Sequence, residues 1–238
     1  MTSSLRHPNH SKERCILIFV RAPVMGKVKR RLGDLVGHEA VLLLYKSFVN
    51  DQLDMLRNLP FDVTICYHPS STRQLVRNWL IHETYFMAQS GENLGQRMKN
   101  AFEKIFSQGY RQALLIGSDL PTLPSSVIHD AFDHLDLHDA VIGPCEDGGY
   151  YLVGFCKDSF SEEVFSGISW GTAKVFDQTL IRLNEKNINF HLTAPLRDID
   201  EYIDLLWLKN SLEKNPGPAT HTYNCIMDLY DSLFPTSM

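Results

Sequence analysis

The stretch QALLIGSDLPTL, residues Gln112–Leu123, carries the strongest strand signal in the chain. Its first half, Gln112–Gly117, contains the apolar run Ala113–Ile116, and such runs are typical of buried parallel strands. Asp119 follows, and the Pro, Thr and Ser residues after it indicate a turn that starts a helix. A carboxylate at the end of a buried strand faces the edge of the sheet at which α/β folds bind ligands.

Six further strands are predicted on either side of this stretch, with amphipathic segments between most of them. The strands are expected at Cys15–Val20, Asp62–Tyr67, Thr84–Ala88, Ala140–Gly143, Tyr150–Phe155 and Asn189–Leu192. Helices are expected at His38–Leu59, Thr72–Leu80, Asn93–Phe106, Thr172–Leu183 and Ile199–Leu212, where apolar residues recur mostly every three or four positions. This alternation predicts a three-layer α/β/α fold with a mainly parallel sheet.

The chain has 238 residues, 44% of them hydrophobic and 21% charged, which is the composition of a globular protein. We expect a single domain over residues 15–213, after a flexible leader at 1–14 and before a C-terminal extension at 214–238 that is expected to be helical. A formal net charge of −5 argues against nucleic-acid binding, which needs a positive field.

The expected location is the cytoplasm. The polar start of the chain does not resemble a signal peptide, and no apolar run reaches the roughly 20 residues that span a bilayer. The five cysteines are scattered without CxxC spacing, which argues against a zinc site and against a disulfide framework. Oligomeric state is not readable from the sequence.

The loop RAPVMGKVKRR, residues 21–31, follows the first predicted strand and is the candidate phosphate-binding segment. A glycine can expose backbone N–H groups, and Lys and Arg can match phosphate charge. The nucleotide-binding candidates of this loop are Arg21, Pro23, Gly26, Lys27, Lys29 and Arg31. The alternative is a solvated basic turn. GxGxxG and GxxxxGK[ST] are both absent, which weakens the dehydrogenase and P-loop ATPase interpretations.

Three aspartates are candidate metal ligands. Asp119 stands at the end of its strand, and Asp198 and Asp200 alternate in an extended segment, so their side chains lie on the same face. Carboxylate oxygens suit Mg²⁺ or Mn²⁺. The alternatives are a turn role for Asp119 and a helix-capping role for Asp200.

The segment PCEDGGY, residues 144–150, is the candidate acceptor side of the site. Gly148 and Gly149 permit close approach of a ligand to the backbone, and Tyr150 follows them. Asp147 is the candidate base or hydroxyl-binding carboxylate. A plain hairpin turn is the alternative, and it is compatible with substrate contact.

Four features outside these loops complete the set. Gln89 and Arg97 are candidates for contacts with the base or ribose of a nucleotide, with a surface role as the alternative for Arg97. Trp170 could border the substrate pocket. His134 and His138 are four residues apart, but His138 falls past the expected helix end, so a solvated pair is predicted.

These motifs, in this order, resemble a known family. FVRAPVMGKVKRRL, GENLGQRM, IGSDLPTL, PCEDGGYYLVGF, ISWGTAKVFDQTLIRL and DIDEYIDL are similar to segments of the rSAM/selenodomain-associated transferases, described as glycosyltransferases of arsenosugar biosynthesis. The resemblance runs from about residue 15 to residue 208 and implies a GT-A-like fold of the nucleotide-diphospho-sugar transferase superfamily. The chain is also similar to guanylyltransferases that activate phospholactate.

By this resemblance, Asp119 is the metal-binding aspartate, Asp198 or Asp200 supplies the second carboxylate, and Gly26–Arg31 is the phosphate loop. DIDEYIDL lacks the Thr-Pro usual in the family, which leaves the second metal ligand open.

Three functions follow from the sequence. The first is metal-dependent transfer of a sugar from a nucleotide sugar to a small-molecule acceptor. The second is transfer of a nucleotidyl group from a triphosphate to a phosphorylated small molecule, with release of pyrophosphate. The third is non-catalytic nucleotide binding.

Overall fold

The computed structural model describes residues 12–215, 217 and 219–234. Most of the predicted leader, residues 1–11, and the last four residues of the predicted C-terminal extension lie outside the described residues. The described chain forms one seven-stranded sheet with the order β3-β2-β1-β4-β6-β5-β7. Its strands are β1 (Arg14–Arg21), β2 (Asp62–His68), β3 (Phe86–Ala88), β4 (Gln112–Ile116), β5 (Ala140–Pro144), β6 (Tyr150–Cys156) and β7 (Phe190–Leu192).

Helices cover both faces of the sheet. β1 sends Ile16, Ile18 and Val20 to one face, where they pack with α2 (His38–Arg57), α3 (Arg73–Trp79) and α5 (Ser125–Leu135). It sends Cys15, Leu17 and Phe19 to the other, where α4 (Leu94–Ser107) and α6 (Val175–Glu185) lie. Both sets are buried, so the strand reads as a continuous apolar run rather than an alternating one. The predicted three-layer α/β/α fold is confirmed.

Among the strands of the described residues, only β6 runs antiparallel to its neighbours. It pairs antiparallel with β4 and β5, whereas the other adjacent strands are parallel. The carboxyl ends of β1, β2, β4 and β5 therefore meet at one edge of the sheet. The β5–β6 hairpin, residues 145–149, turns at this same edge. The three loops selected from the sequence are thus brought to one rim.

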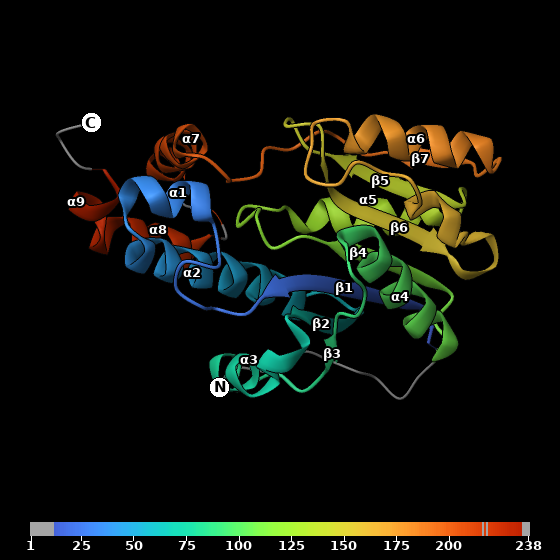
Figure 1. The fold of residues 1–238 in the computed structure, drawn as a ribbon, viewed down its shortest axis with the longest axis horizontal. Helices are drawn as coiled ribbons and strands as arrows, with labels where there is room; N and C mark the ends of the chain where they lie inside the picture. Colours follow the sequence, from blue (N-terminus) through green and yellow to red (C-terminus); the bar gives the residue numbers. More distant parts are fainter. Residues whose placement is uncertain (1–11, 216, 218, 235–238) are drawn as a thin grey trace.

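A second helical group lies at one end of the molecule. Figure 1 shows α1 (Arg30–Val36), α7 (Tyr202–Lys214), α8 (Thr220–Asp228) and α9 (Tyr230–Leu233) gathered around α2. Their apolar side chains form a buried cluster with the first half of α2. Short 3₁₀ turns occupy Ser70–Thr72, Lys157–Ser159 and Glu162–Phe165. No helix within the described ranges has the length and apolarity that a bilayer crossing requires.

Two helices begin a few residues later than predicted, whereas the starts of α3 and α4 differ from the prediction by a single residue. α7 starts at Tyr202 rather than Ile199, because Glu201 caps it and Asp204 reaches back to the Glu201 backbone. α6 starts at Val175 rather than Thr172, because the Thr172 hydroxyl donates to the Ser169 carbonyl and the residue takes part in a turn.

The start of α8 is held by a carboxylate from another helix. Asp51 of α2, 1% exposed, accepts hydrogen bonds from the backbone N–H groups of His221 and Thr222, both at 2.8 Å. Asp51→Ala is expected to lower the free energy of unfolding by about 2–4 kcal/mol, because it leaves buried N–H groups without acceptors. Urea unfolding would measure this. Asp51→Asn keeps one acceptor and should lose less; an unchanged midpoint for Asp51→Ala would contradict the capping role.

The predicted solvated histidine pair is instead part of a half-buried group of three. His138 lies beyond the end of α5, as predicted, but His191 of β7 stacks on His134 with ring centroids 3.4 Å apart and an interplanar angle of 9°. Burial, together with the neighbouring His134 and His138, lowers the pKa of His191.

The lowered pKa of His191 makes stability depend on pH. A pKa lowered in the folded state means that the unfolded chain binds protons first, so stability falls as the pH drops below about 6.5. His191→Phe keeps a ring on His134 and removes one titrating group. We expect the loss of unfolding free energy between pH 7.5 and 5.0 to shrink, by less than about 1 kcal/mol. An unchanged pH profile in urea unfolding would contradict this expectation.

Candidate active site

A cleft of about 430 Å³ opens at the rim where the three loops meet. The residues predicted from the sequence that line it are Arg21, Lys27, Lys29, Arg31, Gln89, Arg97, Asp119, Tyr150 and Asp200. The predicted residues outside its lining are Pro23, Gly26, Asp147, Gly148, Gly149, Trp170 and Asp198. The cleft thus combines the basic loop with two of the three predicted metal ligands.

The loop after β1 turns twice through left-handed backbone. Gly26 has a φ of 69°, which glycine adopts without steric cost. Lys29 has a φ of 43° and stands immediately before α1. A lysine in this conformation is uncommon and occurs where the surroundings fix it, often at functional sites. The backbone therefore aims the Lys29 side chain inward.

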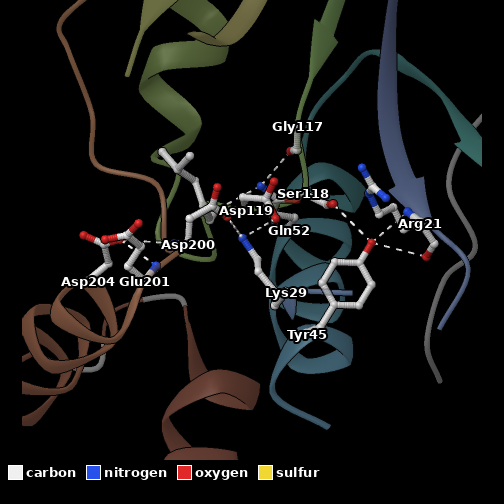
Figure 2. A network of polar contacts seen from close by, with 11 residues as sticks. Arg21, Lys29, Tyr45, Gln52, Gly117, Ser118, Asp119, Asp200, Glu201 and Asp204 are labelled. Atoms are coloured by element: carbon white, nitrogen blue, oxygen red, sulfur yellow. Dashed lines mark hydrogen bonds and ion pairs between the residues drawn. The ribbon is translucent and has the colours of Figure 1, made fainter. Parts of the chain in front are cut away.

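Lys29 joins the basic loop to both acidic segments. Its Nζ lies 2.5 Å from Asp119 Oδ1 and 2.6 Å from Asp200 Oδ1 (Figure 2). The lysine side chain is 5% exposed. Burial works to lower the pKa of Lys29, but the two carboxylates outweigh it and raise that pKa. The charge of Lys29 in turn lowers the pKa of Asp200.

Side chains of α2 hold the Asp119 turn in place through hydrogen bonds. Gln52 Nε2 donates to the carbonyls of Gly117, at 3.1 Å, and Leu120, at 2.9 Å. The Tyr45 hydroxyl lies 3.2 Å from Ser118 Oγ and accepts from the Arg21 backbone N–H at 2.8 Å. Figure 2 shows both side chains reaching from α2 to the two rim loops. One helix thus fixes the spacing between the basic loop and Asp119.

Asp200 is free of the capping role considered for it. The cap of α7 is Glu201, paired with Asp204. The Ile199 N–H donates to the Asp119 carbonyl at 3.1 Å, which ties the two acidic segments together. Asp200 therefore faces Lys29 beside Asp119.

Asp198 belongs to a separate group next to this site. It lies with Cys145 and Asp147, and one potential ligand atom from each lies within 4.8 Å of the others. Burial, Asp147 and Asp200 raise the pKa of Asp198 to about 7.

The predicted glycine hairpin is present, and each glycine has a structural reason. A Cβ on Gly149 would lie 3.1 Å from Asp147 Oδ1, which accepts a hydrogen bond from the Gly149 N–H at 2.8 Å. Gly148 has a φ of 89°, and a Cβ there would meet the Ala173 carbonyl oxygen at 2.3 Å. The hairpin therefore presents Asp147 beside the acidic end of the site.

The other side of the cleft carries cations without partners. Arg21 and Arg97 have no ion pair in the part of the chain that the structure describes, and Arg97 Nε is buried there without a hydrogen-bond partner. Burial and the Arg21 charge lower the pKa of Arg97, and burial, Arg97 and Arg21 lower that of His68. Like charges held together in this way favour an anionic ligand between them.

Gln89 is fixed between the sheet and the cleft. Its Nε2 donates to the Cys66 carbonyl at 2.6 Å, and the residue is 7% exposed. Trp170 instead packs over α4, since a Cβ on Gly95 would lie 2.6 Å from its indole. Pro23 is buried in the loop.

Sequence reasoning missed four residues of this site: Tyr45, Gln52, His68 and Ser118. Tyr45 and Gln52 lie within the helix read as an apolar stripe. Their partners are more than 60 residues away or in another loop, so no local pattern marks them.

Known structures share this architecture. A candidate nucleotide-diphospho-sugar transferase from Desulfovibrio desulfuricans G20 is 37% identical over 94% of this chain and 97% of its own, with a TM-score of 0.88. A cytidylyltransferase from Leptospira borgpetersenii serovar Hardjo-bovis is 15% identical over 96% of this chain and 99% of its own, with a TM-score of 0.55. The 4-diphosphocytidyl-2C-methyl-D-erythritol synthase from Anaerococcus prevotii is 11% identical over 85% and 97%, with a TM-score of 0.57.

The fold is therefore that of the nucleotide-diphospho-sugar transferases, and the GT-A-like architecture expected from the sequence is confirmed. The family described as "Uncharacterized protein conserved in bacteria (DUF2064)" matches residues 52–172. The chain belongs to this family. No curated protein matches it.

Proposed function

We propose that this protein is a metal-dependent transferase that takes its donor group from a nucleotide sugar. The observation that carries the proposal is the convergence of Asp119, Asp200 and Lys29 at the rim of a cleft whose other side is cationic. A diphosphate needs both parts, because cations match its charge and the carboxylates would hold a divalent metal that offsets more of that charge. The 37% identical relative, a candidate nucleotide-diphospho-sugar transferase, supports the same donor class.

The residues present fit a divalent cation. Asp119 and Asp200 offer hard carboxylate oxygens, and both already contact one positive charge, the Lys29 ammonium. Their side chains are 42% and 46% exposed, so each is also reachable from the cleft. We assign the metal to Asp119 and Asp200, with Mg²⁺ or Mn²⁺ as the ion. When bound, such an ion neutralises charge on the departing phosphate.

In the proposed reaction the chain chiefly binds and orients its two substrates. Lys27, Lys29 and Arg31 hold the phosphates. The hydroxyl oxygen of the acceptor attacks the anomeric carbon, and the bond from that carbon to the phosphate oxygen breaks. The nucleoside diphosphate leaves with the bonding electrons. The Asp147 carboxylate takes the hydroxyl proton, with the Asp147–Gly149 hairpin forming the acceptor side.

Nucleotidyl transfer is a second candidate because of the cation count. Arg21, Lys27, Arg30 and Arg97 line the cleft without an ion pair among the described residues, and a triphosphate carries more charge than a diphosphate sugar. A phosphate oxygen of the acceptor would then attack the α-phosphorus, and pyrophosphate would leave.

All five cysteines are free, which fits the cytoplasmic location expected from the sequence.

The test begins with a thermal-shift screen of nucleoside triphosphates and nucleotide sugars, with Mn²⁺ or with EDTA. A true donor at 100 times its Kd adds about 2.7 kcal/mol of stability, which corresponds to a rise in Tm of roughly 5 °C or more. The rise should need Mn²⁺. If no compound in the panel raises the Tm in either condition, nucleotide binding is wrong.

Product analysis then separates the candidate reactions. The stabilising compound is incubated with a panel of sugar, polyol, arsenosugar-precursor and phosphorylated acceptors. Free nucleoside diphosphate indicates glycosyl transfer, and pyrophosphate indicates nucleotidyl transfer. Binding without turnover on any acceptor would support the non-catalytic alternative.

A further inference from the structure

The Lys29 ammonium fills the gap between the two proposed metal ligands. It contacts Oδ1 of both Asp119 and Asp200, and its side chain is almost fully buried while each carboxylate is nearly half exposed (Figure 2). Lysine side chains normally keep the ammonium in water. Here the backbone of Lys29, in the left-handed region, directs it into the site.

A divalent cation and this ammonium compete for the same oxygens. Mg²⁺ binds carboxylate oxygens at about 2.1 Å, a space that Nζ occupies when it lies 2.5 and 2.6 Å from them. Two carboxylates and one ammonium carry a net charge of −1, whereas the same carboxylates with a dication are neutral. A dication and an ammonium on the same two oxygens would repel strongly over a few ångströms.

The cleft offers a second position for the ammonium. Arg21, Lys27 and Arg30 line the same space without an ion pair in the described ranges, so the phosphates of a bound nucleotide are expected beside Lys29. A lysine is a point charge on a flexible stem, so its side chain can change partners while the backbone stays in place.

We propose that Lys29 is a placeholder for the divalent cation: it pairs with Asp119 and Asp200 in the ligand-free protein and passes to the donor phosphates when metal and nucleotide enter together. The inference rests on the proposed function and adds a dependence of metal binding on nucleotide binding. Metal alone binds weakly, because Lys29 would lose its partners. Metal with nucleotide binds well, because the phosphates replace those partners. The two ligands are therefore coupled, each raising the affinity of the other.

The test is a titration of the full chain with Mn²⁺ alone, in which electron paramagnetic resonance measures the concentration of free Mn²⁺. Lys29→Met is expected to bind Mn²⁺ at least roughly tenfold more tightly than the wild type in the absence of nucleotide. Lys27→Met is the matched control: it removes the same charge from the same loop, but Lys27 forms no ion pair with either carboxylate among the described residues. Its affinity for Mn²⁺ alone should stay within about twofold of the wild type.

Coupling gives a second readout. Addition of the nucleotide selected by the thermal-shift screen should raise Mn²⁺ affinity at least tenfold in the wild type and by much less in Lys29→Met. An Mn²⁺ affinity of Lys29→Met equal to or below that of the wild type would overturn the placeholder role.

The two proposals fail differently. If Lys29→Met shows no gain while Asp119→Asn loses Mn²⁺-dependent nucleotide binding, the placeholder is wrong and the proposed function stands. If the wild type binds no Mn²⁺ even with nucleotides present, the proposed function is wrong as well.

Lys29→Met leaves two carboxylates unpaired and could fail to fold without metal. In that case the wild type is measured by NMR with ¹⁵N-labelled lysine. The Lys29 ammonium signal should be protected from solvent exchange in the ligand-free protein and should shift with Mg²⁺ and nucleotide but not with Mg²⁺ alone. An equal shift with Mg²⁺ alone would overturn the proposal.

Discussion

Asp119→Asn is expected to abolish Mn²⁺-dependent nucleotide binding and to lower turnover by about 10²–10³-fold. The amide has the shape of the carboxylate but no charge, so the proposed metal would lose one of its two anionic ligands and Lys29 loses one of its two ion-pair partners. The measurement is the Tm rise with nucleotide and Mn²⁺, followed by initial rates once the acceptor is known.

The fold should survive this substitution. The Asp119 side chain is 42% exposed, and its backbone carbonyl keeps the hydrogen bond from Ile199. The matched control is Asp130→Asn, the same chemical change at an exposed position of α5. It should leave both binding and rates unchanged. A full Mn²⁺-dependent Tm rise in Asp119→Asn would remove the metal site from this position.

Asp200→Asn and Asp198→Asn form the second comparison, and their ranking decides the second metal ligand. Asp200 shares Lys29 with Asp119, whereas Asp198 lies with Cys145 and Asp147. Asp200→Asn is expected to weaken Mn²⁺-dependent nucleotide binding by about 100-fold, which corresponds to about 2.7 kcal/mol.

Asp198→Asn should keep nucleotide binding within a few-fold of the wild type. Asp198 neighbours the Asp147 hairpin, which we propose as the acceptor side of the site. Asp198→Asn is therefore expected to raise the KM for the acceptor or to lower kcat. The measurement is nucleotide titration in Mn²⁺ for both variants. The reverse ranking would assign the metal to Asp198 and leave Asp200 as the partner of Lys29 alone.

The central strands could be predicted closely because each is a short apolar run that burial explains directly, whereas the edge strands β3 and β7 are only partly buried and are shorter than predicted. The strand predicted at Cys15–Val20 spans Arg14–Arg21 in the structure, and the strand predicted at Gln112–Gly117 spans Gln112–Ile116. Helix starts were less predictable, because side chains rather than periodicity set them. At α7 the Glu201–Asp204 capping box overrides an apolar pattern that begins at Ile199.

The loops of the site were visible in the sequence, but their pairings were not. Lys29 and Asp200 are 171 residues apart, and only the fold brings them together. The alternation of Asp198 and Asp200 indicates a shared face, yet the structure divides them between two groups. In the sequence Tyr45 looks like one more residue of an apolar helix stripe. Only the structure shows that its hydroxyl contacts Ser118 in one rim loop and the Arg21 backbone in the other.

α2 does two jobs from adjacent residues. Asp51 grips the first turn of α8, and its neighbour Gln52 supports the turn that carries Asp119. A chain ended near residue 213 would remove α8 from its contact with Asp51, while the adjacent Gln52 would still have to hold the Asp119 turn in place. The helix α8 therefore supports the cleft from a distance through α2. Removing or unfolding α8 is expected to loosen α2 and so to change the spacing between the basic loop and the Asp119 turn.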